Sequence, residues 1–128
     1  MQDYIEQVLR TESKDLNLIQ DRICNSTIIR LDHAADGMCT EAGEFKDVLK
    51  KWKYYGKEID YVNLEEELGD LCYYIGLACD VLGTDFNKIQ QKNIEKLHTR
   101  YPEKFDSTKA INRDLNAERQ VLESGVLT

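Results

Sequence analysis

The sequence predicts an all-α protein, a four-to-five-helix bundle, and three features carry that prediction. The single proline, Pro102, lies far along the chain, so long helices can form before it without interruption. Apolar residues recur at steps of three and four in two long stretches, which is the period of a helix that packs on one face. No stretch of comparable length alternates apolar and polar residues, so strands are not needed.

The first half of the chain predicts one short and one long helix. Residues 2–10 carry apolar side chains at helical spacing, whereas residues 11–27 fit either a short helix or a packed loop. The long helix follows and ends at Gly56, because glycine readily adopts the left-handed conformation that closes a helix. Its apolar stripe comprises Leu31, Ala35, Met38, Ala42, Phe45, Leu49 and Trp52.

Two further helices are predicted in the second half. Asn63 followed by Glu66 resembles a capping box and predicts a helix start, and Gly83 marks the end of that helix. Thr84 can then cap a helix over about residues 85–99, which stops before the proline. The apolar stripe of the first of these helices comprises Leu64, Leu68, Leu71, Ile75, Ala78 and Leu82.

Length and charge limit the classes of protein that the chain can belong to. With 128 residues we expect one domain over 1–128, with a core at about 29–106 and a polar tail over 107–128 that holds a short helix at about 114–123. A net charge of -7 argues against a nucleic-acid polymer as partner.

The sequence lacks a long apolar run and a signal-like N-terminus, so no membrane contact and a cytoplasmic location are expected. The four cysteines are expected to be buried, unpaired thiols.

Two acidic pairs predict a metal site. Glu41 and Glu44 are three residues apart, as are Glu67 and Asp70, and each pair encloses a glycine at the same position. If their helices pack antiparallel, the four carboxylates converge. Because converging like charges repel, a divalent cation would stabilise them, and oxygen ligands favour Mg²⁺, with Mn²⁺ as a substitute.

Other interpretations of these acids remain open. Acidic pairs on helices are commonly part of a solvated surface, although the shared glycine position favours a site. The internal glycines each cost about 1 kcal/mol in a helix, which close backbone approach or room for a metal and phosphate could justify. A di-iron bundle would need Glu-x-x-His on two helices, and the sequence offers this spacing once, at Glu95 and His98.

Two cations and an amide recur on one face of the helix predicted over 85–99. Asn93, Lys96 and Arg100 follow Ile89 at steps of four, three and four. These side chains could neutralise the acids of a neighbouring helix. With a metal among those acids, the same cations would suit the oxygens of a polyphosphate.

Together the motifs resemble the MazG-like family of all-α nucleoside triphosphate pyrophosphohydrolases. The resemblance rests on Glu41-Ala42-Gly43-Glu44, Glu67-Leu68-Gly69-Asp70 and the segment from Asn93 to Pro102, and it extends weakly over Ile111 to Leu115. It implies a helical bundle assembled as a homodimer or a dimer of dimers. It also implies an enzyme that uses Mg²⁺ to convert a nucleoside triphosphate to the monophosphate and pyrophosphate.

By this resemblance, Glu41, Glu44, Glu67 and Asp70 are the expected catalytic and metal-binding residues, while Asn93, Lys96, Arg100 and Tyr101 would contact the substrate. Thr40 departs from the family pattern, because the motif usually begins with two adjacent glutamates. Two alternatives therefore stay open. One is a pyrophosphohydrolase for a compound such as phosphoribosyl-ATP, and the other is a non-catalytic helical binding or dimerisation module with the same fold.

Overall fold

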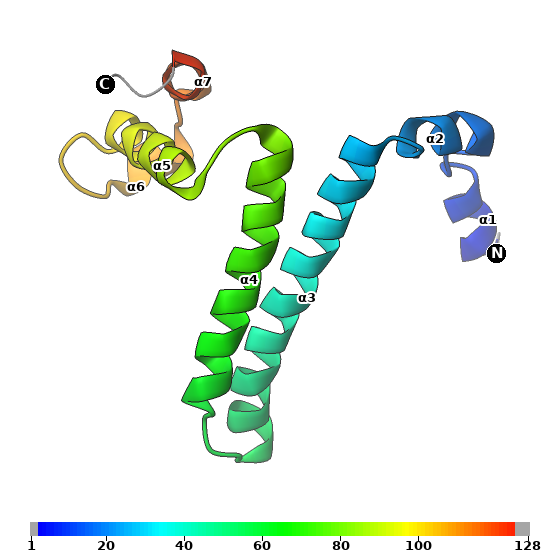
Figure 1. Cartoon of the computed structure of the whole chain (residues 1–128), viewed down its shortest axis with the longest axis horizontal. Coiled ribbons are helices and arrows are strands. Elements are labelled where there is room, and N and C mark those ends of the chain that lie inside the picture. The colour runs from blue at the N-terminus through cyan, green and yellow to red at the C-terminus, as the bar shows by residue number, and fades with distance from the viewer. Residues whose placement is uncertain (1–2, 125–128) are drawn as a thin grey trace. The chain divides into compact units, whose positions relative to one another are not determined.

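The computed structural model describes residues 3–124, and within that range the protein has helices and no strand. The all-α prediction is therefore confirmed. Figure 1 shows the helices in chain order. They are α1 (Tyr4–Leu9), α2 (Leu16–Ile23), α3 (Ser26–Tyr55), α4 (Tyr61–Leu82), α5 (Phe86–Arg100), α6 (Ser107–Ile111) and α7 (Leu115–Ser124).

Polar side chains at the helix starts explain most of these boundaries. Asp15 caps α2, which settles the ambiguous stretch 11–27 as a helix followed by a tight link. Oδ1 of Asn25 then accepts hydrogen bonds from the backbone N–H groups of Thr27 and Ile28, so α3 starts almost at once. At the other end, Gly56 has a φ of 66° and closes α3 where the sequence predicts it.

Two predicted caps are displaced, one by three residues and the other by one. The helix α4 begins at Tyr61, because Oδ1 of Asp60 accepts from the backbone N–H of Asn63 at 3.0 Å. Asn63 therefore lies inside the first turn, where its side chain is free to bond elsewhere. Similarly, Asp85 caps α5 in place of Thr84, since its carboxylate accepts from the backbone N–H of Lys88.

The polar tail contains two helices. The predicted helix at 114–123 corresponds to α7, and α6 was not predicted. Residue 2 of the first predicted helix and residues 125–128 of the tail lie outside the described residues. None of the described helices combines the length and the apolar content that a membrane span needs.

The described chain forms two compact units, divided between Leu71 and Cys72. In the first unit, α3 runs antiparallel to the first half of α4, joined by a short turn (Figure 1). The helix α4 continues into the second unit, where α5 packs with α7. The single domain predicted from the length remains a prediction.

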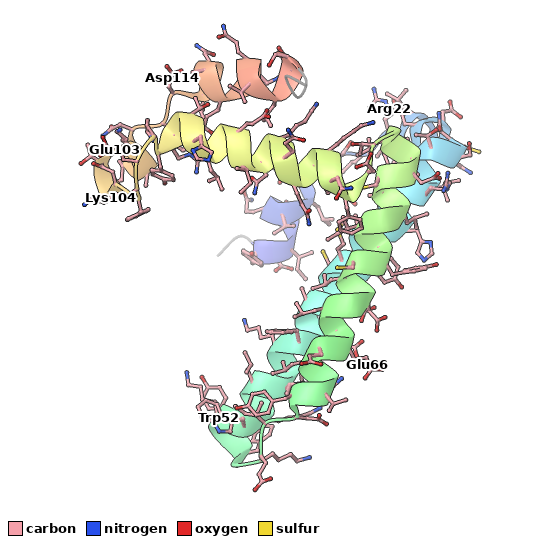
Figure 2. All side chains as sticks on the ribbon, turned by 60° about the vertical axis from the view of Figure 1, so that its left-hand side comes forward. Arg22, Trp52, Glu66, Glu103, Lys104 and Asp114 are labelled. Carbon is pink, nitrogen blue, oxygen red and sulfur yellow. The ribbon has the colours of Figure 1, made fainter. Side chains whose placement is uncertain are left out.

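The buried positions of α3 are offset from the predicted apolar stripe. Ala34, Gly37 and Val48 are buried, whereas Leu49 is 38% exposed and Trp52 51% exposed. Figure 2 shows Trp52 near the turn that joins α3 to α4. Periodicity predicts that an apolar face exists, but it does not say which neighbour covers that face. Here Leu49 and Trp52 at the end of the stripe are exposed, whereas Leu31, Met38 and Phe45 are half-buried.

The four cysteines are free thiols, as predicted, but three of them are exposed. The expectation of burial is therefore correct for Cys79 alone.

Candidate metal and phosphate site

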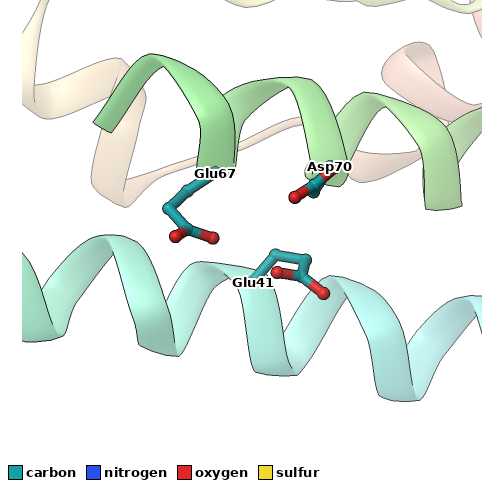
Figure 3. Close-up of side chains that lie close together, drawn as sticks. All are labelled: Glu41, Glu67 and Asp70. Carbon is teal, nitrogen blue, oxygen red and sulfur yellow. The ribbon is translucent and has the colours of Figure 1, made fainter. Parts of the chain in front are cut away.

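Three carboxylates from two helices converge in the first unit. Glu41 projects from α3, and Glu67 and Asp70 project from α4 toward it (Figure 3). One oxygen of each side chain lies within 4.8 Å of the others. The i, i+3 spacing on α4 and the antiparallel path of α3 thus bring together three of the four acids that the sequence proposes as ligands.

Glu67 is the most enclosed member of this three-carboxylate cluster. Its residue surface is 5% exposed, and Nδ2 of Asn63 donates a hydrogen bond of 2.6 Å to its Oε1. Asn63 lies four residues earlier on the same helical face, so the amide approaches the carboxylate from one turn away. This bond fixes the side-chain orientation of Glu67 and leaves Oε2 for another partner.

The surroundings of Glu41 disfavour the charged form of its carboxyl group. Burial raises the pKa of its carboxyl group, and the negative charges of Glu44 and Asp70 raise that pKa further. The hydroxyl group of Thr40 is a neutral donor to this carboxylate, with its Oγ1 3.4 Å from Oε1 of Glu41. A cation between the carboxylates would relieve this repulsion.

Glu44 lies outside the three-carboxylate cluster, on the exposed part of α3, although its charge reaches Glu41. Gly43 and Gly69 lie near these acids, and one explanation offered for them was a close approach of two backbones. A Cβ added at Gly43 or Gly69 would meet no atom of the described chain within 4 Å. Close approach of backbones within the chain therefore does not explain them.

The donor set fits a hard divalent cation. All three converging side chains offer carboxylate oxygens, and neither histidine nor cysteine belongs to the cluster. Oxygen donors of this kind suit Mg²⁺ or Mn²⁺ and leave coordination positions for water and phosphate oxygens.

The residues predicted to bind substrate lie in the second unit, on and just after α5. Asn93 is exposed, while Lys96 and Arg100 are half-buried on the same helical face. Tyr101 caps the end of α5, and its ring lies 5.5 Å from that of Phe105.

Arg100 has partners that the sequence did not predict. Its Nε and Nη2 donate to the two carboxylate oxygens of Glu118 on α7, at 2.9 and 2.7 Å. Arg113 donates to the same two oxygens, at 3.2 and 2.6 Å. Because 18 residues separate Arg100 from Glu118, no helical spacing indicates this contact.

The fold and the site define an all-α chain with three clustered carboxylates, from two antiparallel helices, that could hold a divalent cation. Comparison with known families gives the particular family. The model of the MazG nucleotide pyrophosphohydrolase domain matches residues 31–105, more than half of the chain. The protein belongs to this family. No curated protein and no solved structure shows significant similarity to it.

Proposed function

We propose that the protein is a Mg²⁺-dependent nucleoside triphosphate pyrophosphohydrolase that serves nucleotide-pool control. The observation that carries the proposal is the three-carboxylate cluster, whose members all fall within the segment matched by the family model. In the proposed reaction, water adds across the anhydride between the α and β phosphates. The products are a nucleoside monophosphate and pyrophosphate.

Glu41, Glu67 and Asp70 would hold the metal, with Glu44 as a fourth carboxylate within electrostatic reach. When bound, Mg²⁺ would neutralise phosphate charge and lower the pKa of a coordinated water. Asn63 would keep the Glu67 carboxylate turned toward the cluster through its hydrogen bond of 2.6 Å. The ligand geometry is thus partly organised before any ligand arrives.

The other proposed roles follow from charge and exposure. Glu44 is exposed and outside the cluster, so it would accept the proton of the attacking water. Lys96 and Arg100 would face the phosphate oxygens as a point charge and a planar fork, and they would stabilise the negative charge that develops there. Asn93 and Tyr101 would contact the sugar or a phosphate.

We also propose a second copy of the chain as partner. The first unit places a carboxylate cluster between its two long helices and leaves large apolar side chains outside. Leu49 is 38% exposed, and Trp52 and Leu68 are each 51% exposed. Leu49 and Trp52 are three residues apart on α3 and so share a face, and apolar side chains exposed together favour an interface. Sedimentation equilibrium should give a dimer or tetramer, and a monomer at micromolar concentration would contradict the proposal.

The activity is tested by product analysis. Purified protein with Mg²⁺ is incubated with a panel of canonical, deoxy and oxidised nucleoside triphosphates, and pyrophosphate and phosphate are quantified separately. We expect pyrophosphate and the monophosphate in equal amounts from at least one substrate. Release of phosphate alone would contradict the proposed bond cleavage.

Variants assign the activity to the proposed residues. Glu44→Ala and Asp70→Ala should abolish pyrophosphate release, and Glu67→Gln should lower it strongly. Glu65→Gln is the matched control, because Glu65 is an exposed acid on the same helix, two residues from Glu67. Activity that survives Asp70→Ala would show that the three-carboxylate cluster is not required for catalysis.

The two alternatives give different results in the same assay. Cleavage of phosphoribosyl-ATP without cleavage of nucleoside triphosphates would indicate a biosynthetic pyrophosphohydrolase. Metal-dependent thermal stabilisation without turnover of any substrate would indicate a binding module. In that case Thr40→Glu should restore activity, if the missing first glutamate of the family motif is the cause.

A further inference from the structure

The second unit contains an ionic triad around a buried carboxylate, and the triad lies largely outside the family match. Glu118 on α7 is 4% exposed, and its two oxygens accept four hydrogen bonds from the guanidinium groups of Arg100 and Arg113. The family match ends at residue 105, before both Arg113 and Glu118. This arrangement is therefore a property of this chain that the family assignment does not explain.

The triad is well suited to hold a carboxylate in its ionised form. A buried carboxylate is costly unless it is paired and hydrogen-bonded, and here both oxygens are fully engaged. The two guanidinium groups lower the pKa of Glu118 far below its usual range. Glu118 therefore stays negatively charged and keeps its hold on Arg100 throughout the neutral range.

The pairing fixes Arg100 without using up its binding capacity. The two bonds to Glu118 use Nε and one N–H of Nη2, on one edge of the guanidinium group. An arginine has five N–H donors, so three, on Nη1 and Nη2, are not bonded to Glu118. Tyr101 is a further neighbour of this guanidinium group, with its ring centroid 5.6 Å from Cζ. The side chain of Arg100 is 16% exposed, and the residue lines a cavity together with Lys109, Asn112 and Asp114.

The charge balance also favours an anion. A single Arg–Glu pair would be neutral and would cancel the attraction of Arg100 for phosphate. With Arg113 as a second guanidinium group on the same carboxylate, the triad carries a net charge of about +1 at neutral pH. Arg113 is 41% exposed at its side chain, so part of this charge lies at the surface.

We propose that Glu118 is a positioning residue of the reaction, which orients Arg100 so that N–H groups not bonded to Glu118 meet a phosphate of the substrate, with Arg113 keeping the pair positively charged. The inference rests on the proposed function, since it takes Arg100 as a phosphate ligand. It assigns the C-terminal helix α7 a part in substrate binding. A guanidinium group held on one edge loses less freedom when it binds the next acceptor on its other edge.

The test combines kinetics with binding of inorganic tripolyphosphate, a probe that contains the phosphates alone. Glu118→Gln keeps the shape of the side chain but loses the charge and one acceptor oxygen. We expect it to lower kcat/KM and to weaken tripolyphosphate binding in calorimetry, each by about 10- to 100-fold. Glu123→Gln is the matched control, because Glu123 is an exposed acid on the same helix that pairs with Arg119.

A double-mutant cycle separates positioning from a merely structural role. If Glu118 acts through Arg100, the double variant Arg100→Gln, Glu118→Gln should bind and turn over no worse than Arg100→Gln alone. If the fold-losses of the two single variants multiply in the double variant, the proposal is overturned. So would a Glu118→Gln protein that melts at a lower temperature but keeps wild-type binding, or one that binds tripolyphosphate more tightly.

The two proposals fail in different ways. If the wild-type protein releases no pyrophosphate but loses tripolyphosphate affinity on Glu118→Gln, the proposed reaction is wrong and the positioning of Arg100 stands. If the wild-type protein hydrolyses nucleoside triphosphates and the cycle shows no coupling, the positioning is wrong and the reaction stands. If the wild-type protein does not bind tripolyphosphate, the positioning proposal is overturned.

Discussion

Binding of Mg²⁺ to the three-carboxylate cluster should raise the melting temperature by a calculable amount. A ligand that binds only the folded state, at a free concentration about 100 times its Kd, stabilises it by about 2.7 kcal/mol. Unfolding of a chain of 128 residues has an entropy of about 0.27 kcal/mol/K at about 2.1 cal/mol/K per residue. The expected shift is therefore about 10 °C, measured by circular dichroism with and without metal.

Substitutions in the cluster should remove this shift. Glu67→Gln keeps an amide oxygen that can accept from Asn63, but it removes one of the mutually repelling charges. We expect the metal-free Glu67→Gln protein to melt at or above the wild-type temperature and to gain little from Mg²⁺. Glu65→Gln should behave like the wild type. An equal Mg²⁺ shift in the wild type and in Glu67→Gln would refute the reasoning, because the metal would then bind elsewhere.

The same melts test the prediction of a single domain. All three carboxylates lie in the first unit, before Cys72. If the chain unfolds as one domain, Mg²⁺ should move one transition as a whole. If the two units unfold separately, one of two transitions should move and the other should stay.

Three further changes are expected to have distinct effects. Asn63→Ala removes the hydrogen bond of 2.6 Å that orients Glu67, so Mg²⁺ affinity should fall about 10-fold in calorimetry, and an unchanged affinity would contradict this role. Gly43→Ala meets no described atom within 4 Å, so it should stabilise α3 by about 1 kcal/mol in thermal melts, and a loss of stability would contradict the open space. Because the folded-state pKa of Glu118 is lowered from 4.5, its stabilising effect is present above that pH and lost as the pH falls below it. Urea midpoints should therefore drop more steeply in acid for the wild type than for Glu118→Gln, and parallel profiles would argue against the pairing.

Local signals account for the parts of the fold that the sequence predicts well. Gly56 ends α3 as expected, because a left-handed closing residue is a local requirement. The cap of α4 was predicted three residues too late, because Asp60 and Asn63 can both cap a helix. The amide of Asn63 bonds to Glu67 one turn later, and that choice depends on a side chain beyond the capping box.

In the candidate site, too, local spacing predicts some features, and contacts between helices decide the others. An i, i+3 spacing predicts that two acids share a face, and on α4 both acids reach the cluster. On α3 the contact with α4 falls at Glu41, and Glu44 lies beyond it, which depends on how the two helices cross. The contact between Arg100 and Glu118 joins two helices through a link whose path no periodicity specifies.

The cost of the three-carboxylate cluster and its usefulness have one origin. Within the first unit, the surface between α3 and α4 contains charged groups where a hairpin would gain more from apolar ones, while large apolar side chains remain outside. Asn63 fixes Glu67, whereas burial, together with repulsion from the charges of Glu44 and Asp70, raises the pKa of Glu41. A cation that removes this repulsion is bound more strongly because the free state is unfavourable, and a second copy that covers the apolar side chains would offset the loss of stability. The carboxylates between α3 and α4 therefore support the proposed metal, and the exposed apolar side chains support the proposed partner.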